Sequence, residues 1–292
     1  METNNTKASL KAMVHSTYDV QQLRIQMGNR IVANFKAKLG QTPNMPEEEL
    51  DAEGKKILKD IRDRYKKITD GVKVFPSHKK FVGDEIISSY TELCLLGQYL
   101  DLETHEQQHF RRLEAILDDF PIWEQWLKGV RGCGPAMAGV IISEIDITKA
   151  RYASSLWKLA GLDVASDGRG RSRREEHLVK VSYTNTKGEA AERNSITFNP
   201  FLKTKLLGVL GVSFLRSGSE YAQSYYDYKH RLESREDWQA RTKLHRHRAA
   251  IRYMIKRFLA DLYVQWRTLE GLPVAAEYHE AILHHVHRSH AA

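Results

Sequence analysis

The chain has 292 residues, of which 41% are hydrophobic and 28% are charged, so it can bury a core of one large or two modest domains and is not disordered throughout. Its 45 Lys and Arg outnumber its 37 Asp and Glu, and the formal net charge of +8 favours a polyanionic partner, nucleic acid before an anionic membrane. Two cysteines exclude a disulfide scaffold, and no apolar run approaches the ~18 residues of a membrane span. Because the polar first ten residues show no apolar leader, the sequence predicts a cytoplasmic protein without a membrane partner.

Residues 1–117 are predicted to be helical and to brace or oligomerise the protein. Apolar residues recur at steps of three and four in 18–39, which is typical of one helix face. A second helix is predicted after Asn44 up to about Ile68, followed by a connector at 69–83. Two further helices are predicted at 84–100 and 102–117. Their charged faces fit solvated surface better than a binding site.

Residues 118–275 are predicted to form a second domain that is mainly helical with one small β-hairpin, and residues 276–292 a His-rich tail. The chain as a whole is therefore expected to be mainly α. Strand-like alternation in 177–184, a turn at 185–188 and a return strand near 195–198 make up the hairpin. Helices are predicted at 121–130, 136–145, 200–210, 220–233 and 238–269. In the tail, frayed polar chain is favoured over a metal site.

The first candidate site is a glycine turn between two of these helices, in the segment VRGCGPAMAGVI at 130–141. Glycines free a short connection of Cβ crowding, and Pro135 suits the first position of the following helix. The N–H groups there lie at a positively polarised helix end, which can bind a phosphate oxygen. The candidate DNA-binding residues of this turn are Arg131, Gly132, Gly134 and Ala136. The alternative is a helix corner whose glycines serve packing alone.

A loop rich in glycine and arginine, GLDVASDGRGRSRR at 161–174, is the second candidate site. Guanidinium groups on a flexible backbone suit adaptive contacts with phosphates. The candidate DNA-binding residues of the loop are Arg169, Arg171, Arg173 and Arg174. Ser166 and Ser172 also lie in it, and either could attack phosphorus if a base or the arginines activated it. On the residues alone, serines that only cap the loop are favoured over catalytic ones.

The third candidate site is the basic start of the last helix, RTKLHRHRAAIRYMIKR at 241–257, which holds seven Lys or Arg and no acidic residue. Solvated helix faces usually mix charges of both signs. An unbalanced face therefore favours a helix that follows phosphates over ordinary surface. The candidate DNA-binding residues, placed by helical spacing on one face, are Arg241, Arg248, Arg252 and Lys256.

The order of these segments resembles the C-terminal domain of insertion-sequence transposases of the 110/116/902 family. The resemblance covers about residues 105–270 and rests on GCGPAMAG, LWKLAGL, the Gly/Ser/Arg loop, FNPFLKTKLLGVL and HRAAIRYMIKRFLADLYVQW. It implies a helix-hairpin-helix at the glycine turn, a role for Lys203 in binding DNA, and transposition by DNA strand cleavage and joining guided by an RNA. Ser166 is the nearest match to the family's loop serine, and Ser172 is the alternative.

The resemblance also implies an N-terminal nuclease domain that holds Mg²⁺ on four acidic residues, and here the sequence departs from the family. No strand ending in a metal-binding Asp is found in 1–117, so no metal ligand or cofactor is predicted in this chain. Mg²⁺ is expected only if a partner supplies the nuclease domain.

Three hypotheses for the function follow. The protein is a transposase or recombinase, a non-catalytic DNA- or RNA-binding protein derived from one, or a helical assembly protein whose glycine turn is structural. The residues favour the second hypothesis for the isolated chain. The expected partners are DNA, a guide RNA and further copies of the chain.

Overall fold

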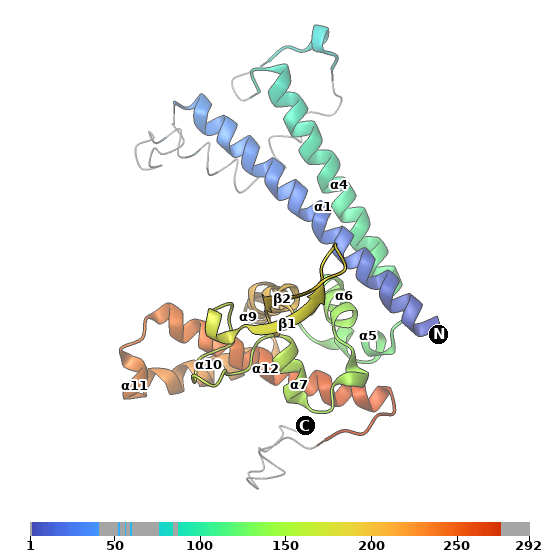
Figure 1. Ribbon diagram of the computed structural model, residues 1–292. Helices are drawn as coiled ribbons and strands as arrows, with labels where there is room; N and C mark the ends of the chain where they lie inside the picture. Colours follow the sequence, from blue (N-terminus) through green and yellow to red (C-terminus); the bar gives the residue numbers. More distant parts are fainter. Residues whose placement is uncertain are drawn as a thin grey trace. The chain divides into compact units, whose positions relative to one another are not determined.

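A computed structural model of the chain describes residues 2–40, 76–83 and 87–275, and in addition positions 52, 56 and 59 (Figure 1). The chain divides into two compact units. The N-terminal unit comprises Ala12–Arg112, and the C-terminal unit comprises Met1–Lys11 with Leu113–Ala292. The helix predicted after Asn44 and the His-rich tail lie outside the described residues.

Two long helices that lie side by side supply the N-terminal unit (Figure 1). α1 spans Glu2–Lys38 and α4 spans Tyr90–Leu117, and the short 3₁₀ turn η2 spans His78–Lys80. Apolar side chains at helical spacing on the two helices, with Ile87 just before α4, form the core of the unit. The buried members of this core are Ile31, Phe35, Ile87, Leu93, Leu96 and Tyr99.

The helices of this unit are longer than the sequence predicts. The first begins at Glu2 instead of near Tyr18, because no Gly or Pro interrupts the polar stretch before it. The two helices predicted at 84–100 and 102–117 are one, since α4 continues without a break through Asp101. A charged residue such as Asp101 lowers helix propensity by only about 0.7 kcal/mol, too little to end a packed helix.

Two carboxylates that are nearly buried join α1 to α4. Glu106 accepts from the Arg24 guanidinium, and Glu92 accepts from Asn34 Nδ2 at 2.9 Å and from the Ser88 N–H at 2.7 Å. Burial raises the pKa of Glu92, but these hydrogen bonds outweigh it and leave the pKa below its usual value. Because a buried carboxylate is costly without partners, the two pairs fix how α1 and α4 are aligned.

The C-terminal unit begins with short helices around a buried central one. They are α5 (Pro121–Gln125), η3 (Leu127–Gly129), α6 (Pro135–Glu144), η4 (Ile147–Lys149) and α7 (Ala153–Leu159). Pro121 and Pro135 start α5 and α6, where a missing N–H costs no hydrogen bond. α6 is buried from Met137 to Ser143, so it is the central helix of this region. The helix predicted at 121–130 is present but divided in two.

A two-stranded antiparallel sheet lies beyond the loop at 161–174 and the 3₁₀ turn η5 (Glu175–His177). β1 is Val179–Thr184 and β2 is Ala190–Ser195, and Val179 pairs with Ser195. The predicted hairpin is confirmed, but the return strand predicted near 195–198 is wrong. Pairing begins directly after a tight turn in which the Asn185 N–H donates to the Glu189 carbonyl at 2.9 Å.

The described residues that follow the hairpin are mainly helical. α8 (Pro200–Lys205), the π-helical turn η6 (Leu206–Leu210) and α9 (Gly211–Ser217) follow one another without a break, and then come α10 (Glu220–Glu233), α11 (Glu236–Gln239) and α12 (Lys243–Leu269). The single helix predicted at 238–269 is divided because Thr242 caps α12, its hydroxyl accepting from the His245 N–H at 3.2 Å.

Aromatic rings join α12 to its neighbours in the core. The Phe258 ring stacks on Trp126 at 5.8 Å between centroids and meets Phe214 of α9 and Tyr221 of α10 edge-on at 5.3 and 5.4 Å. The mainly α class is confirmed. Among the residues that the structure describes, no helix has the length and apolar character to cross a membrane.

Candidate nucleic-acid interface

The glycine turn joins η3 to α6 and leaves several backbone donors unpaired. The Cys133 N–H donates to the Val130 carbonyl at 2.9 Å and closes the turn. The N–H groups of Gly132, Gly134 and Ala136 make no hydrogen bond to any part of the chain that the structure describes. Gly134 is the N-cap of α6, so two of these donors lie at the positive end of a ten-residue helix. The turn therefore offers donors that an anion could accept.

Gly132 and Gly134 differ in their surroundings. Gly132 has a φ of +90°, and a Cβ there would lie 2.6 Å from Ser217 Oγ and 3.1 Å from a ring carbon of Phe214. Its carbonyl accepts from the Ser213 hydroxyl at 2.8 Å. Gly132 therefore serves packing against α9, as the helix-corner alternative expects. Gly134 has a φ of −77° and no atom within 4 Å of a Cβ built on it, so packing does not require glycine there.

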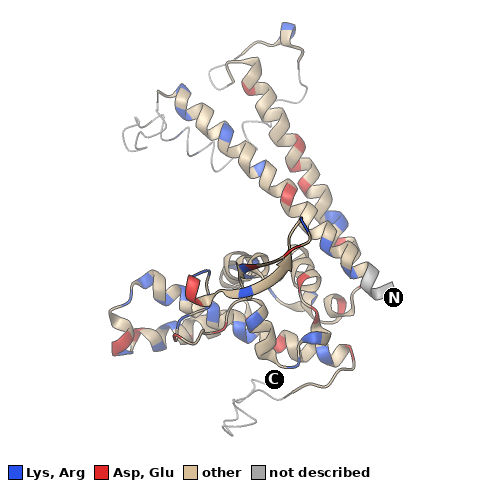
Figure 2. Ribbon diagram, viewed as in Figure 1, with Lys and Arg blue, Asp and Glu red and all other residues tan. Residues whose placement is uncertain are grey.

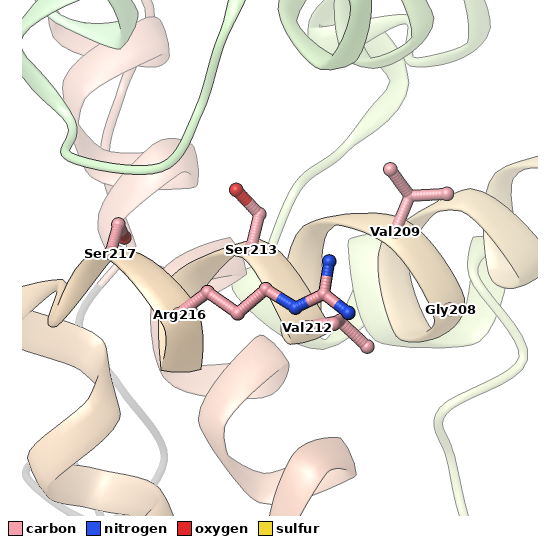
Figure 3. A pocket seen from close by; sticks show the side chains of 6 residues that line it. All are labelled: Gly208, Val209, Val212, Ser213, Arg216 and Ser217. Atoms are coloured by element: carbon pink, nitrogen blue, oxygen red, sulfur yellow. The ribbon is translucent and has the colours of Figure 1, made fainter. Parts of the chain in front are cut away.

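A shallow pocket of about 440 Å³ lies on η6 and α9 beside the turn (Figure 3). Figure 3 shows the side chains of Ser213 and Arg216 on α9. The Ser213 hydroxyl is the group that donates to the Gly132 carbonyl of the turn. The lining residues are Gly208, Val209, Val212, Ser213, Arg216 and Ser217.

Cations next to the glycine turn differ in whether a carboxylate pairs with them. Arg131 is exposed, whereas the Lys128 ammonium lies 2.7 Å from a Glu124 oxygen.

Cys133 is buried, which raises its pKa to about 12. Its thiol therefore stays protonated and is no nucleophile.

The loop at 161–174 is ordered by its own hydrogen bonds and is not the flexible segment that the sequence predicts. The Ala165 N–H donates to the Arg169 carbonyl at 2.8 Å, and the Arg171 N–H donates to the Asp163 carbonyl at 3.0 Å. The Arg171 guanidinium also pairs with the Asp163 carboxylate at 2.8 Å, so its charge is partly neutralised. The exposed arginines of the loop are Arg169, Arg173 and Arg174.

A histidine connects Ser172 of this loop to a carboxylate. His177 Nδ1 lies 2.9 Å from Ser172 Oγ and accepts the Ser172 N–H at 3.0 Å, while Nε2 lies 3.1 Å from an Asp167 oxygen. Because Nδ1 accepts, the ring proton is on Nε2 and is donated to Asp167. The Arg169 N–H and then His177 hold the Asp167 pKa below its usual value. Ser166 is exposed, and its hydroxyl has no hydrogen bond among the described residues.

The residues predicted from the basic C-terminal segment do not share one helix. Arg241 precedes the first residue of α12, while Arg248, Arg252 and Lys256 follow one another at four-residue steps along it. Figure 2 shows Lys and Arg recurring along α12. Arg241 and Arg248 are exposed, whereas Arg252 and Lys256 are half-buried.

Half-buried cations from three elements come together beside the loop. We call them the cation cluster: Arg171, Lys203, Arg252 and Lys256. A Cβ on Gly170 would lie 1.8 Å from Arg252 Nη1, so this guanidinium lies directly against the loop backbone. The Lys203 ammonium donates to the Arg171 carbonyl at 2.6 Å. The Lys203 and Lys256 ammonium groups also lie over the rings of Phe198 and Trp157, at 4.3 and 5.2 Å from the centroids.

Burial and mutual repulsion act on the charges of the cation cluster. Burial, and then the charge of Arg252, lower the pKa of Lys203 to about 8, and Asp163 offsets only part of this. Burial lowers the pKa of Arg252, and burial with the charge of Arg252 lowers that of Lys256. The surroundings therefore disfavour the charged forms of Lys203, Arg252 and Lys256.

Metal-binding groups are not evident in the described residues, which contain no set of three His, Cys, Asp or Glu side chains able to hold an ion. His247, one of the closely spaced histidines of α12, instead has its Nδ1 2.7 Å from the Tyr225 hydroxyl.

Asp163 and His177 are functional candidates that the sequence alone does not indicate. His177 lies five residues after Ser172, a separation that fits neither a helix face nor a strand face. Asp163 is the third residue of the loop, and no pattern in the sequence pairs it with Arg171. Their roles depend on how the loop folds back on itself, which the composition of the segment does not specify.

Comparisons with known proteins identify no relative: no protein-family model, no curated protein and no solved structure matches this chain.

Proposed function

We propose that the C-terminal unit binds the phosphate backbone of nucleic acid, and of DNA in particular, as a DNA-binding protein of the transposase type. The observation that carries this proposal is the set of unpaired N–H donors of Gly132, Gly134 and Ala136, with Arg131 exposed beside them. A helix start lined with free amides and accompanied by cations binds phosphate oxygens without reading sequence. In this proposal the glycine turn is the contact part of a helix-hairpin-helix.

Exposed arginines elsewhere in the unit support the same function. Arg169, Arg173 and Arg174 project from an ordered loop, and Arg248 lies on α12. No ion pair joins any of these four to a carboxylate in the described part of the chain. Unpaired guanidinium groups on a preorganised backbone lose less conformational entropy when they bind phosphates than groups on a flexible loop.

Substitution of Gly134 tests the role of the turn. A side chain is tolerated there, because φ is −77° and the space around a Cβ is open. Gly134→Glu would place a carboxylate at the amide donors, and Gly134→Gln is a neutral control of the same shape. The full chain would be titrated with labelled duplex DNA and with duplex RNA, by fluorescence anisotropy.

We expect Gly134→Glu to weaken DNA binding about tenfold relative to Gly134→Gln, which corresponds to about 1.4 kcal/mol. A carboxylate at a helix start stabilises the helix by about 0.3–1 kcal/mol, so this loss would not reflect unfolding. Equal affinities of the two variants would refute the role of the turn. Tighter binding of RNA than of DNA would refute the assignment to DNA.

A second candidate function, DNA strand transfer, is favoured by the contact of Ser172 with His177. The Ser172 hydroxyl would attack phosphorus and form an Oγ–P bond, and its proton would pass to His177 Nδ1. The leaving oxygen would depart with the electrons of its bond to phosphorus and take up a proton from water. Asp167 would stabilise the imidazolium that results. Ser166, the nearest match in the resemblance, has no such partner within the described residues.

A covalent adduct tests this second function. The full chain would be incubated with labelled duplex and branched DNA, with and without Mg²⁺, and separated on a denaturing gel. Strand transfer through Ser172 predicts a protein–DNA adduct that Ser172→Ala abolishes and Ser166→Ala retains. An adduct that survives Ser172→Ala, or none with the wild-type chain, would reject it and leave the non-catalytic function.

A further inference from the structure

The cation cluster holds more positive charge than the chain around it neutralises. Among the described residues, Asp163 is the one carboxylate that acts on Lys203, Arg252 and Lys256, and it is already bonded to Arg171. Within the described residues, neither Arg252 nor Lys256 has an ion pair, and the Arg252 guanidinium donates no hydrogen bond. Four formal positive charges thus meet one negative charge.

Such an arrangement costs free energy in the unliganded protein. Burial of a cation is unfavourable unless hydrogen bonds and opposite charge compensate it. The pKa of Lys203, lowered to about 8 by burial and by Arg252, reflects this cost. Lys203 and Arg252 are half-buried, so neither residue is fully enclosed by the protein.

We infer that the cation cluster is an anion site that holds a single phosphate group of the bound nucleic acid. The planar guanidinium of Arg252 presents several N–H donors that match two phosphate oxygens, while Lys203 and Lys256 act as point charges beside them. The close approach of Arg252 to Gly170 places the guanidinium directly against the loop backbone, beside Arg171 and Lys203. This inference rests on the proposed function, which it extends from the glycine turn to a second, half-buried contact.

Inorganic phosphate is the probe for this site, with the full chain at constant ionic strength. Its binding to the wild type, Arg252→Gln and Lys243→Gln would be measured by calorimetry. Lys243→Gln is the control, because Lys243 is an exposed cation at the start of the same helix and is not among the residues proposed to contact phosphates. We expect the phosphate dissociation constant to rise about tenfold in Arg252→Gln and by no more than about twofold in Lys243→Gln. Lys203→Met is a second variant in which the same loss is expected.

The link to nucleic acid needs a separate measurement on the same proteins. In a salt titration of duplex binding, loss of one phosphate contact makes the plot of log affinity against log salt less steep by about 0.9. We expect this decrease in Arg252→Gln together with weaker binding. Phosphate binding that is equal in Arg252→Gln and Lys243→Gln, or absent from the wild type, would overturn the anion site. A duplex affinity and slope unchanged in Arg252→Gln would overturn its occupation by nucleic acid.

Failure of the proposed function gives a different result. If the wild-type chain bound no DNA at all, the proposed function would be rejected whatever the phosphate titration gave. The thermal midpoint of each variant without phosphate checks that it folds. We expect this midpoint not to fall in Arg252→Gln, since the substitution removes a repelled charge.

Discussion

The two glycines of the turn, Gly132 and Gly134, have different structural roles. Gly132 occupies a left-handed backbone conformation and approaches α9 closely, whereas Gly134 has an ordinary conformation and open surroundings. The sequence predicts both as members of one phosphate-binding turn. Only the position of α9, which comes from residues some eighty positions later, separates the packing glycine from the one beside the unpaired donors.

Alanine at these two positions is therefore expected to act differently on stability. Gly132→Ala should lower the free energy of unfolding by about 1–3 kcal/mol, because of the strained φ and the contact with Ser217. Gly134→Ala should change it by no more than about 0.5 kcal/mol. Urea unfolding of the two variants checks this. Equal destabilisation by both would contradict the packing role of Gly132.

The charge of Lys203 in the cation cluster lowers the free energy of unfolding by an amount that depends on pH. Its pKa is about 8 in the folded protein, lowered by burial and by Arg252 and Arg171 against the opposing charge of Asp163. An unfolded lysine has a pKa of about 10.4. Below about pH 8 the folded protein therefore holds an unfavourable charge, and this cost is relieved as the pH rises from about 8 to about 10.4.

Replacing Lys203 with methionine removes the charge and keeps the apolar stem. We expect Lys203→Met to be more stable than the wild type by about 1 kcal/mol at about pH 7, with a smaller difference at about pH 9.5. Urea unfolding at both values measures this difference. A gain that grows with pH, or a loss of stability at about pH 7, would contradict the account of Lys203.

Whether the sequence predicts a helix or strand correctly depends on whether residues within that segment determine it. The hairpin, α10 and the proline-started helix α6 follow from alternation, periodicity and Pro positions, and the sequence predicts them. It places the return strand of the hairpin too late in the chain and joins α5 to η3 in one helix. The division before α12 depends on the Thr242 cap, which the sequence contains but the periodicity of 238–269 conceals. The fusion of two predicted helices into α4 depends on packing against α1.

The loop at 161–174 shows where local signals are insufficient. Its composition predicts a flexible basic loop, and the arginines and Ser172 are correctly placed in it. Its order comes from backbone hydrogen bonds and from a buried histidine outside the segment. No periodic pattern indicates such a contact in advance.

His177 should therefore determine the order of the loop. His177→Ala removes the hydrogen bonds to Ser172 and Asp167 and leaves a buried space, so we expect a loss of about 1–3 kcal/mol in the free energy of unfolding. Amide exchange in 163–172 should accelerate at the same time. Ser166→Ala is the control, since this hydroxyl has no partner among the described residues. Unchanged exchange in His177→Ala would show that the loop is ordered by other contacts.

The surplus of positive charge over the chain indicates a polyanionic partner, and the distribution of that charge decides which cations are available to bind it. Lys128, Arg171 and Arg235 are paired with carboxylates, while Arg131, Arg248 and Arg252 have no ion pair among the described residues. Net charge alone does not distinguish the two groups, because pairing depends on the fold. The sequence indicates the candidate site residues but not which of them pair with a carboxylate.

The most direct test of the account is the salt dependence of binding between the full wild-type chain and a duplex DNA of arbitrary sequence. If the glycine turn, the loop arginines and the cation cluster contact about four to six phosphates, the plot of log affinity against log salt should be linear with a slope of about −4 to −5. Mixed-sequence duplexes should bind with similar affinity. An affinity that does not fall with salt, or no binding at low salt, would contradict the account.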